Sequence, residues 1–502
     1  MAKATKVIRV DRLDQCANTG KQAALKAVVA EWRVQAQILA NEQWFLWQYT
    51  GQCNKMHGRK YPDSPLGAAR VQMCRHQVVG VIDGHLASLA DQFKSMVAQS
   101  SLTTEQKHRL YRINKARAWQ HRLPPTFKTA PFVDENDLRL ARTLFRRLLK
   151  THRKPSFRFI NVVMDERAVK CAKASDSKVV DYWLTLPTLE RDGRQFRKIA
   201  VPLKSNDFAE GRKGQRLTTW QMNLNKDGVL SFGRLTDVKK PFEQSVETYQ
   251  VRTPVLALDW GMNTLFASSE GDLLGRGTLD KISALDKTIC AIARGQQRHG
   301  LKPRDSARYC AKVSAMRGYL KTEVNRIFNR LVATRAPGHL VVEKLDFRNP
   351  NLSKRMNRLI SNFGRGVIKD KLADLGSKYG ITHEEVNPAY TSQECHNTAC
   401  GYVDRRNRDG QQFQCRACGK QQHADVKAAK TLRHRCSDDA LKPLHGRTAI
   451  LDVLVRRYLE RFDRPRWSAL SRPRSRGAAL DPRLSNPHFA DWTAKARSLH
   501  GL

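Results

Sequence analysis

The sequence lacks any long apolar run. No stretch of about 18 uncharged apolar residues occurs in it, so we expect no transmembrane helix. Its first residues, Met1–Val7, contain no apolar segment of the signal-peptide type. These absences argue against an integral membrane protein and predict a cytoplasmic location.

The cysteines do not form the pattern of a disulfide framework. There are 11 of them, an odd number, in a chain of 502 residues that shows no secretory signal. Seven are scattered: Cys16, Cys53, Cys74, Cys171, Cys290, Cys310 and Cys436. The other four fall between positions 395 and 418, and such a cluster is typical of a metal site.

Acidic residues are scarce relative to basic ones. Lys and Arg number 90 against 47 Asp and Glu, which gives a net charge of +43. A compact chain with this charge repels itself, so we expect a polyanionic partner. The alternatives are a solvated basic surface and a membrane-surface binder, but a membrane binder usually concentrates its charge on one helix or tail. Here the positive charge runs through the whole chain, which favours nucleic acid and predicts no membrane partner.

The first half of the chain changes from helical to strand texture. Residues 6–10 alternate like a short strand, while 20–122 and 134–150 have the apolar spacing of helices. Aromatic residues of the first helical segment are expected in its core, although one or two could stack on bases instead: Trp32, Trp44, Phe45 and Trp47. From about 155 to 250, β-rich runs separated by glycines predict an antiparallel barrel or sandwich, with a hairpin at Asp227-Gly228.

The second half has the texture of an α/β domain. A continuous apolar strand over 255–258 ends at Asp259, and another over 339–342 ends at Glu343. Long basic helices are expected between them, over 280–335. The chain after 436 is basic and broken by prolines, and it could be a disordered RNA-binding arm or a packed extension.

Three acids stand out by their positions: Asp259, Glu343 and Asp425, the last at the start of a predicted helix. A carboxylate at the end of a buried strand is unfavourable unless it is paired or bound to a metal. Phosphodiester hydrolysis with two Mg²⁺ ions about 3.5–4 Å apart supplies a reason for such a set. Each acid alone is more commonly a helix or turn cap. Together, beside the cysteine cluster, they favour a nuclease site in which the same three acids are catalytic residues and magnesium ligands.

The cysteine cluster has the form of two zinc knuckles. Its members are Cys395 and Cys400 in the first half and Cys415 and Cys418 in the second, each half followed by glycine. Four thiolates suit a tetrahedral structural Zn²⁺ and leave no open position for catalysis. His396 or His423 could replace one thiolate. The first half is loosened to Cys-x-x-x-x-Cys, so a relic knuckle without metal is the alternative.

With these motifs in view, the chain resembles the TnpB family of RNA-guided nucleases and the compact type V CRISPR effectors related to it. The resemblance rests on residues 387–393, the paired knuckles and residues 424–429, within a match over about 255–435. It implies a prokaryotic RNA-guided DNA endonuclease. The expected partners are a guide RNA and a target double-stranded DNA read beside a short adjacent motif. Magnesium and structural zinc are the implied metals; the oligomeric state is not predicted.

The resemblance also implies a multidomain α+β fold with a helical recognition domain, a β-barrel wedge domain and an RNase H-fold (RuvC-like) nuclease domain with an inserted zinc knuckle. The expected boundaries are 1–15 for the first wedge strand, 16–152 for the recognition domain, 153–252 for the wedge barrel, 253–390 for the nuclease domain, 391–424 for the zinc-knuckle insert that binds target nucleic acid, 425–436 for the last nuclease segment and 437–502 for the basic extension.

One departure from the family pattern bears on activity. The family often has Asn two residues after the third acid, where this chain has Lys427, which could bind a phosphate or weaken metal binding. This departure and the loosened knuckle favour one alternative, a guided DNA-binding protein that cuts weakly or not at all. A second alternative is an RNase H-fold nuclease or transposase without a guide.

Overall fold

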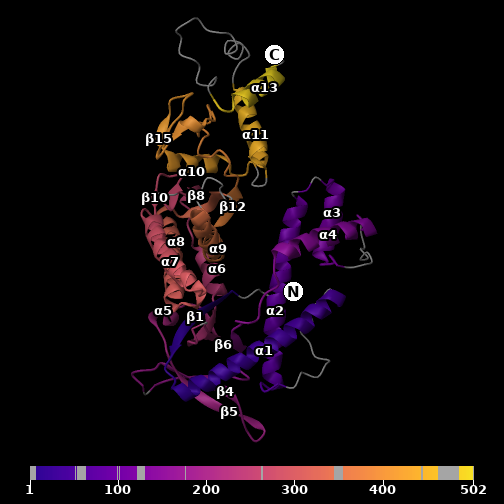
Figure 1. The fold of residues 1–502 in the computed structure, drawn as a ribbon, viewed down its shortest axis with the longest axis vertical. Coiled ribbons are helices and arrows are strands. Elements are labelled where there is room, and N and C mark those ends of the chain that lie inside the picture. Colours follow the sequence, from indigo (N-terminus) through magenta and orange to yellow (C-terminus); the bar gives the residue numbers. More distant parts are fainter. Residues whose placement is uncertain are drawn as a thin grey trace. The chain divides into compact units, whose positions relative to one another are not determined.

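The computed structural model describes residues 7–50, 53, 64–98, 100, 102–120, 131–175, 177–225, 227–261, 264–343, 354–441, 445–461 and 486–500. The chain forms two compact units, Met1–Pro241 (unit 1) and Phe242–Leu502 (unit 2). Both units contain helices and strands, so the multidomain α+β class is confirmed (Figure 1). The assignment of their parts to recognition, wedge and nuclease domains stays a prediction.

Unit 1 is built on a seven-stranded antiparallel sheet with the order β2-β6-β7-β1-β5-β4-β3. Its strands are β1 (Ile8–Gln15), β2 (Val162–Met164), β3 (Lys170–Lys173), β4 (Tyr182–Asp192), β5 (Gln195–Lys204), β6 (Gln215–Leu224) and β7 (Leu230–Asp237). The hairpin expected at Asp227-Gly228 is present, because β6 and β7 pair with Leu224 opposite Leu230. The first strand is longer than the alternation at 6–10 predicted, and it pairs with β7 and β5.

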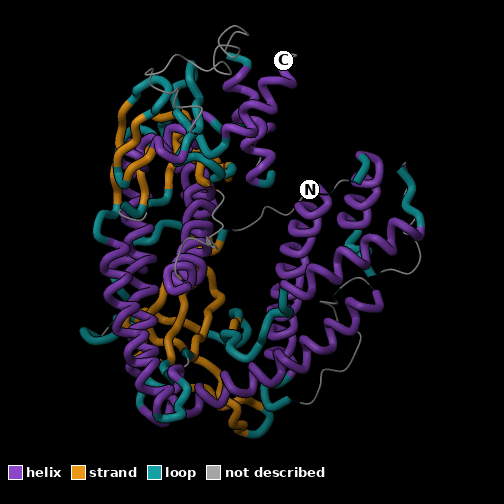
Figure 2. Tube along the Cα trace, turned by 45° about the horizontal axis from the view of Figure 1, so that its top comes forward, coloured by secondary structure: helices purple, strands orange, loops and turns teal. Residues whose placement is uncertain are grey.

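The helices of unit 1 are α1 (Thr19–Thr50), α2 (Ala68–Ala98), α3 (Thr104–Lys115), α4 (Glu135–Thr151) and the short α5 (Asp207–Glu210). Helix α4 begins where the sequence predicts it, because the Asp134 carboxylate accepts a hydrogen bond from the backbone N–H of Asp137 at 2.7 Å. Figure 2 shows these helices in purple and the sheet strands in orange.

The aromatic residues of α1 divide between the core and the surface. Trp32, Trp44 and Trp47 are at most 8% exposed and lie in the hydrophobic core of unit 1, as expected. Phe45 is 58% exposed. It is therefore the member of that aromatic set that lies mostly at the surface.

Unit 2 contains a five-stranded sheet with the order β10-β9-β8-β11-β12. The strands are β8 (Thr253–Asp259), β9 (Phe266–Ser268), β10 (Leu273–Leu274), β11 (Pro337–Glu343) and β12 (Thr382–Val386). Strands β8, β11 and β12 run parallel, whereas β9 and β10 form an antiparallel edge. The expected strands ending at Asp259 and Glu343 are thus β8 and β11, at the centre of the sheet.

The helices of unit 2 are α7 (Thr278–Arg298), α8 (Ala307–Arg335), α9 (Lys354–Tyr379), α10 (Ala424–His434), α11 (Arg447–Leu459) and α13 (Phe489–His500), and α6 (Lys239–Glu247) spans the border with unit 1. Short 3-10 turns occupy Pro303–Asp305, Arg405–Asn407 and Asp439–Leu441. The cysteine-rich part adds a small sheet of β13 (Arg408–Asp409), β14 (Gln412–Gln414) and β15 (Gln421–His423). None of the described helices combines the length and apolarity needed to cross a bilayer.

The two faces of the five-stranded sheet are covered by different helices. Side chains of parallel partners in register share a face, so Leu256, Leu258, Leu340 and Val342 lie on one face, where they form a core with α7, α8 and α9. Ala257 and Val341 lie on the other face, where they pack against Leu432 of α10. The second face is the one that carries the acids.

Candidate active site and metal centres

Strand register brings the first two predicted acids together. Leu258 of β8 is the partner of Val342 of β11, so the next residues, Asp259 and Glu343, lie side by side at the carboxyl ends of parallel strands. Both belong to the face of the sheet that α10 covers, because they are two residues beyond Ala257 and Val341.

Helix α10 brings the third acid to the same place. It packs on β8, β9 and β11, and its first turn carries Asp425, which is 3% exposed. Asp425 interacts electrostatically with Asp259, as Glu343 does. The structure therefore brings all three sequence-predicted acids to one site. Within the described residues, their oxygens do not form a group as tight as the four cysteine sulfurs, which all lie within 4.8 Å of one another.

The site remains unfavourable for three ionised carboxylates, although Arg408 and Lys427 partly offset their charge. Burial raises the pKa of Asp259 well above its usual range, and the neighbouring Glu343 and Asp425 raise it further. Loss of solvent likewise raises the pKa of Glu343 to about 7. Bound divalent cations would relieve both effects, and oxygen ligands are those that Mg²⁺ prefers, so the residues present fit magnesium.

Two residues that the sequence did not single out hold Asp425. Arg408 Nη2 donates to Asp425 Oδ1 at 2.8 Å, and Thr264 Oγ1 donates to Asp425 Oδ2 at 3.3 Å. Gly261 passes so close that a Cβ there would lie 3.2 Å from the same carboxylate. Thr264 and Gly261 follow the first acid closely in sequence, so their position near the site could have been predicted. Arg408 gives no such signal, because it belongs to the small sheet of the cysteine-rich part.

Lys427 interacts electrostatically with Asp259, but its ammonium group makes its hydrogen bonds elsewhere. The side chain is fully buried, and Nζ donates to the backbone carbonyls of Thr391 at 2.6 Å and Glu394 at 2.9 Å. It also lies 4.1 Å from the centre of the Phe413 ring. Burial lowers the pKa of Lys427 to about 7. In the structure this lysine braces the segment before the first knuckle, and its suggested binding of a phosphate or weakening of metal binding stays a prediction.

The four predicted zinc ligands converge. Cys395 Sγ lies 3.7 Å from Cys418 Sγ, and Cys400 Sγ lies 3.8 Å from Cys415 Sγ. Sulfurs about 2.3 Å from a tetrahedral Zn²⁺ are about 3.8 Å apart, so this spacing fits zinc despite the loosened first knuckle. Neither His396 nor His423 joins the group, although both are described, so their suggested replacement of a thiolate is not seen.

The knuckles are covered by the chain that follows them. Tyr402, Tyr458 of α11 and Trp492 of α13 form one aromatic cluster with ring centroids 4.5–5.4 Å apart. The Arg461 guanidinium donates to the carbonyl of Cys400 at 2.8 Å. The described residues of the predicted extension 437–502 are thus a packed extension, while its Arg-Pro motifs at 464–467 and 472–476 lie outside the described residues.

Comparison with known proteins places the similarity in this part of the chain. The family described as Cas12f1-like, TNB domain, matches residues 366–432, a segment that includes the four cysteines and Asp425. The resemblance to TnpB and the compact type V effectors is confirmed. Arg408, which holds the third acid of this TnpB-like part, lies inside the matched segment.

Individual relatives match over the same limited extent. A CRISPR-associated endodeoxyribonuclease Cas12f1 of Sulfoacidibacillus thermotolerans is 36% identical over 77 residues, which is 15% of this chain and 18% of the relative. A TnpB-like protein of Aquifex aeolicus is 37% identical over 79 residues, which is 15% of this chain and 25% of the relative. These matches span well under two thirds of the relatives' own lengths.

Among solved structures, a Cas12f1–sgRNA–target DNA complex aligns with a TM-score of 0.39 and 13% identity, over 87% of this chain and 100% of that one.

Proposed function

We propose that the chain is an RNA-guided DNA endonuclease of the TnpB or compact type V effector kind. The observation that carries the proposal is the convergence of Asp259, Glu343 and Asp425 from two strand ends and one helix start on a single face of the sheet. The similarity of residues 366–432 to Cas12f1-like proteins supports a nuclease in which that site acts on nucleic acid.

In this proposal the three acids hold two magnesium ions, which when bound supply an activated water and stabilise the leaving oxygen. The chain's own residues do the positioning. Arg408 and Thr264 fix the Asp425 carboxylate, and the central strands fix the other two acids. The tetrathiolate holds structural zinc and so keeps Arg408, on the small sheet beside the knuckles, in reach of Asp425.

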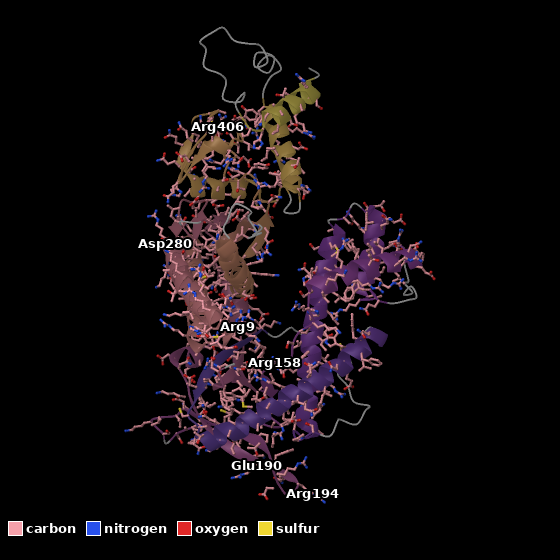
Figure 3. The ribbon with its side chains drawn as sticks, in the orientation of Figure 1. Arg9, Arg158, Glu190, Arg194, Asp280 and Arg406 are labelled. Carbon is pink, nitrogen blue, oxygen red and sulfur yellow. The ribbon has the colours of Figure 1, made fainter. Side chains whose placement is uncertain are left out.

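A guide RNA and a target double-stranded DNA are the proposed partners. The net charge of +43 needs polyanions to neutralise it, and exposed arginines such as Arg158 and Arg194 on unit 1 are drawn in Figure 3. In such complexes base pairing reads the target sequence, and the protein reads backbone shape and a short adjacent motif.

The first test is sequencing of the RNA that co-purifies with the protein expressed with its native flanking DNA. The recovered RNA then programmes cleavage of a matched plasmid in Mg²⁺. We expect one discrete RNA and cleavage that depends on its guide. Asp259→Ala should abolish cutting and keep guided binding, whereas Asp280→Ala, at an exposed acid on α7, should cut like the wild type.

Each other outcome has a definite meaning. Guided binding without cutting by the wild type would favour the DNA-binding alternative that acts by target occupancy. Cutting by the Asp259→Ala variant would refute the site. Absence of any bound RNA would leave a nuclease or transposase without a guide.

A further inference from the structure

A second cluster of metal-binding side chains lies under α10, near its C-terminal end. It consists of His339 on β11, Glu384 on β12 and Cys436, just beyond the end of the helix. The register pairs Glu384 with Val341, so Glu384 and His339 lie on the same face of the sheet as the catalytic acids. In the described part of the chain, one ligand atom of each residue lies within 4.8 Å of the others.

This cluster is separate from the active site. The apolar side chains of Ala257, Val341, Val386 and Leu432 fill the space under the middle of α10, with Cys436 packed at their edge. Asp425 lies at the first turn of that helix and Cys436 lies beyond its last turn. The two sets of ligands thus belong to opposite ends of one helix.

The ring of His339 is oriented to offer a lone pair. Its Nδ1 lies 2.8 Å from Thr382 Oγ1, and the same hydroxyl lies 3.4 Å from the carbonyl of Gly338. In the tautomer with the proton on Nδ1, the ring donates to the hydroxyl, which can donate in turn to that carbonyl. Nε2 is then unprotonated, as a metal ligand requires.

The Nε2 atom of His339 also lacks a partner of its own. It is buried from solvent and makes no hydrogen bond within the described residues. The carboxylate oxygen Oε2 of Glu384 is 3.9 Å away, beyond hydrogen-bonding distance. In that tautomer two lone pairs face each other, and a bound cation between them would stabilise the arrangement.

Glu384 is held in place from its other oxygen. The backbone N–H of Ser437 donates to Glu384 Oε1 at 2.8 Å, which leaves Oε2 turned toward His339. Ser437 reaches this position in a left-handed conformation with φ of 59°, which is uncommon for a residue other than glycine. Nearby cations are engaged elsewhere, because Arg433 pairs with Glu270 and Arg435 pairs with Glu394.

We propose that His339 Nε2, Glu384 Oε2 and Cys436 Sγ bind one divalent transition metal of the zinc class. A mixed nitrogen, oxygen and sulfur set suits zinc and excludes magnesium, which takes hard oxygen ligands. The negative end of the helix dipole also favours a cation at this end of α10. The site ties β11 and β12 to α10 and takes a water as its fourth ligand. It is independent of the proposed nuclease function.

The test is the zinc content of the untagged full-length chain after zinc loading and dialysis, measured by elemental analysis. We expect two zinc ions per wild-type chain, one of them in the tetrathiolate. Cys436→Ser and Glu384→Gln should each hold one, while Cys310→Ser, at an exposed cysteine of the same unit, should hold two. Thr382→Val, which removes the hydroxyl that orients the ring, should weaken the second site about 10–100-fold in chelator competition.

Equal zinc content in the wild type, Cys436→Ser and Glu384→Gln would overturn the proposal. One zinc per wild-type chain would also overturn the proposal, since His339 and Glu384 would then be joined by a proton and not by a metal ion. Glu384→Gln keeps the acceptor for Ser437, so it should fold. A circular dichroism spectrum identical to the wild type, together with one zinc, separates loss of the metal from loss of the fold.

Discussion

Replacing Lys427 by Met tests whether this lysine acts in the active site or only in the structure. Methionine keeps the apolar stem in its buried place and removes the two hydrogen bonds to the carbonyls of Thr391 and Glu394. A net loss of about 0.5–1.5 kcal/mol for each bond gives a destabilisation of about 1–3 kcal/mol. Lys427→Ala should be worse, because it also leaves a cavity.

The assay is thermal unfolding of the zinc-loaded chain beside guide-dependent cleavage per folded molecule. Because the ammonium group donates its hydrogen bonds to carbonyls and interacts with Asp259 only electrostatically, cleavage by Lys427→Met should fall by less than about tenfold, or about 1.4 kcal/mol of barrier. Lys321→Met, at an exposed lysine of α8, is the matched control and should change neither quantity. A folded, zinc-loaded Lys427→Met chain that cannot cut would show that the lysine takes part in the chemistry and would refute the structural role.

Three further changes probe other contacts. Gly401→Ala should destabilise the knuckles and raise zinc loss to a chelator, because φ is +67° there and the new Cβ would meet the Arg461 guanidinium; unchanged zinc retention would contradict this. Arg408→Ala should lower plasmid cleavage about 10–100-fold with guided binding retained, since the buried Asp425 loses its cationic partner at 2.8 Å. Cleavage at the wild-type rate would show that the Arg408–Asp425 ion pair does not contribute to activity. For Glu210, partial burial opposes ionisation, but hydrogen bonds from Ser205, Tyr182 and Arg216 outweigh it and lower the pKa to about 2. This contribution to stability is present above the unfolded pKa of about 4.3 and is lost as pH falls through about 2. Glu210→Gln should therefore lower the melting temperature at pH 7 and lose that deficit near pH 2, whereas a deficit that persists at pH 2 would show a packing effect.

The central strands of unit 2 could be predicted because they are buried on both faces. Such strands read as continuous apolar runs, and β8 and β11 do so up to Asp259 and Glu343. The strand β12 gave no such signal, because Thr382–Val386 lies at the edge of the sheet and is mostly polar. It is a strand because β11 offers it a parallel partner, which no local pattern reveals.

The chain after the knuckles shows the same limit. Its basic residues and prolines left a disordered arm and a packed extension equally open. Helices α11 and α13 are ordered because Tyr458 and Trp492 bury their rings against Tyr402. That contact depends on the folded knuckles, which a reading of local composition does not contain.

The sequence by itself determined the identity of the three acids, the spacing of the four cysteines and the resemblance they carry, because these are patterns within single elements. Only the tertiary structure decided that Arg408 holds Asp425, that the Lys427 ammonium is turned toward backbone carbonyls, and that Cys436 meets His339 and Glu384. The physical reason is that each of these contacts joins elements distant in the chain. Strand register and the packing of α10 on one face of the sheet set their geometry, and neither quantity is encoded by the spacing of residues along one element.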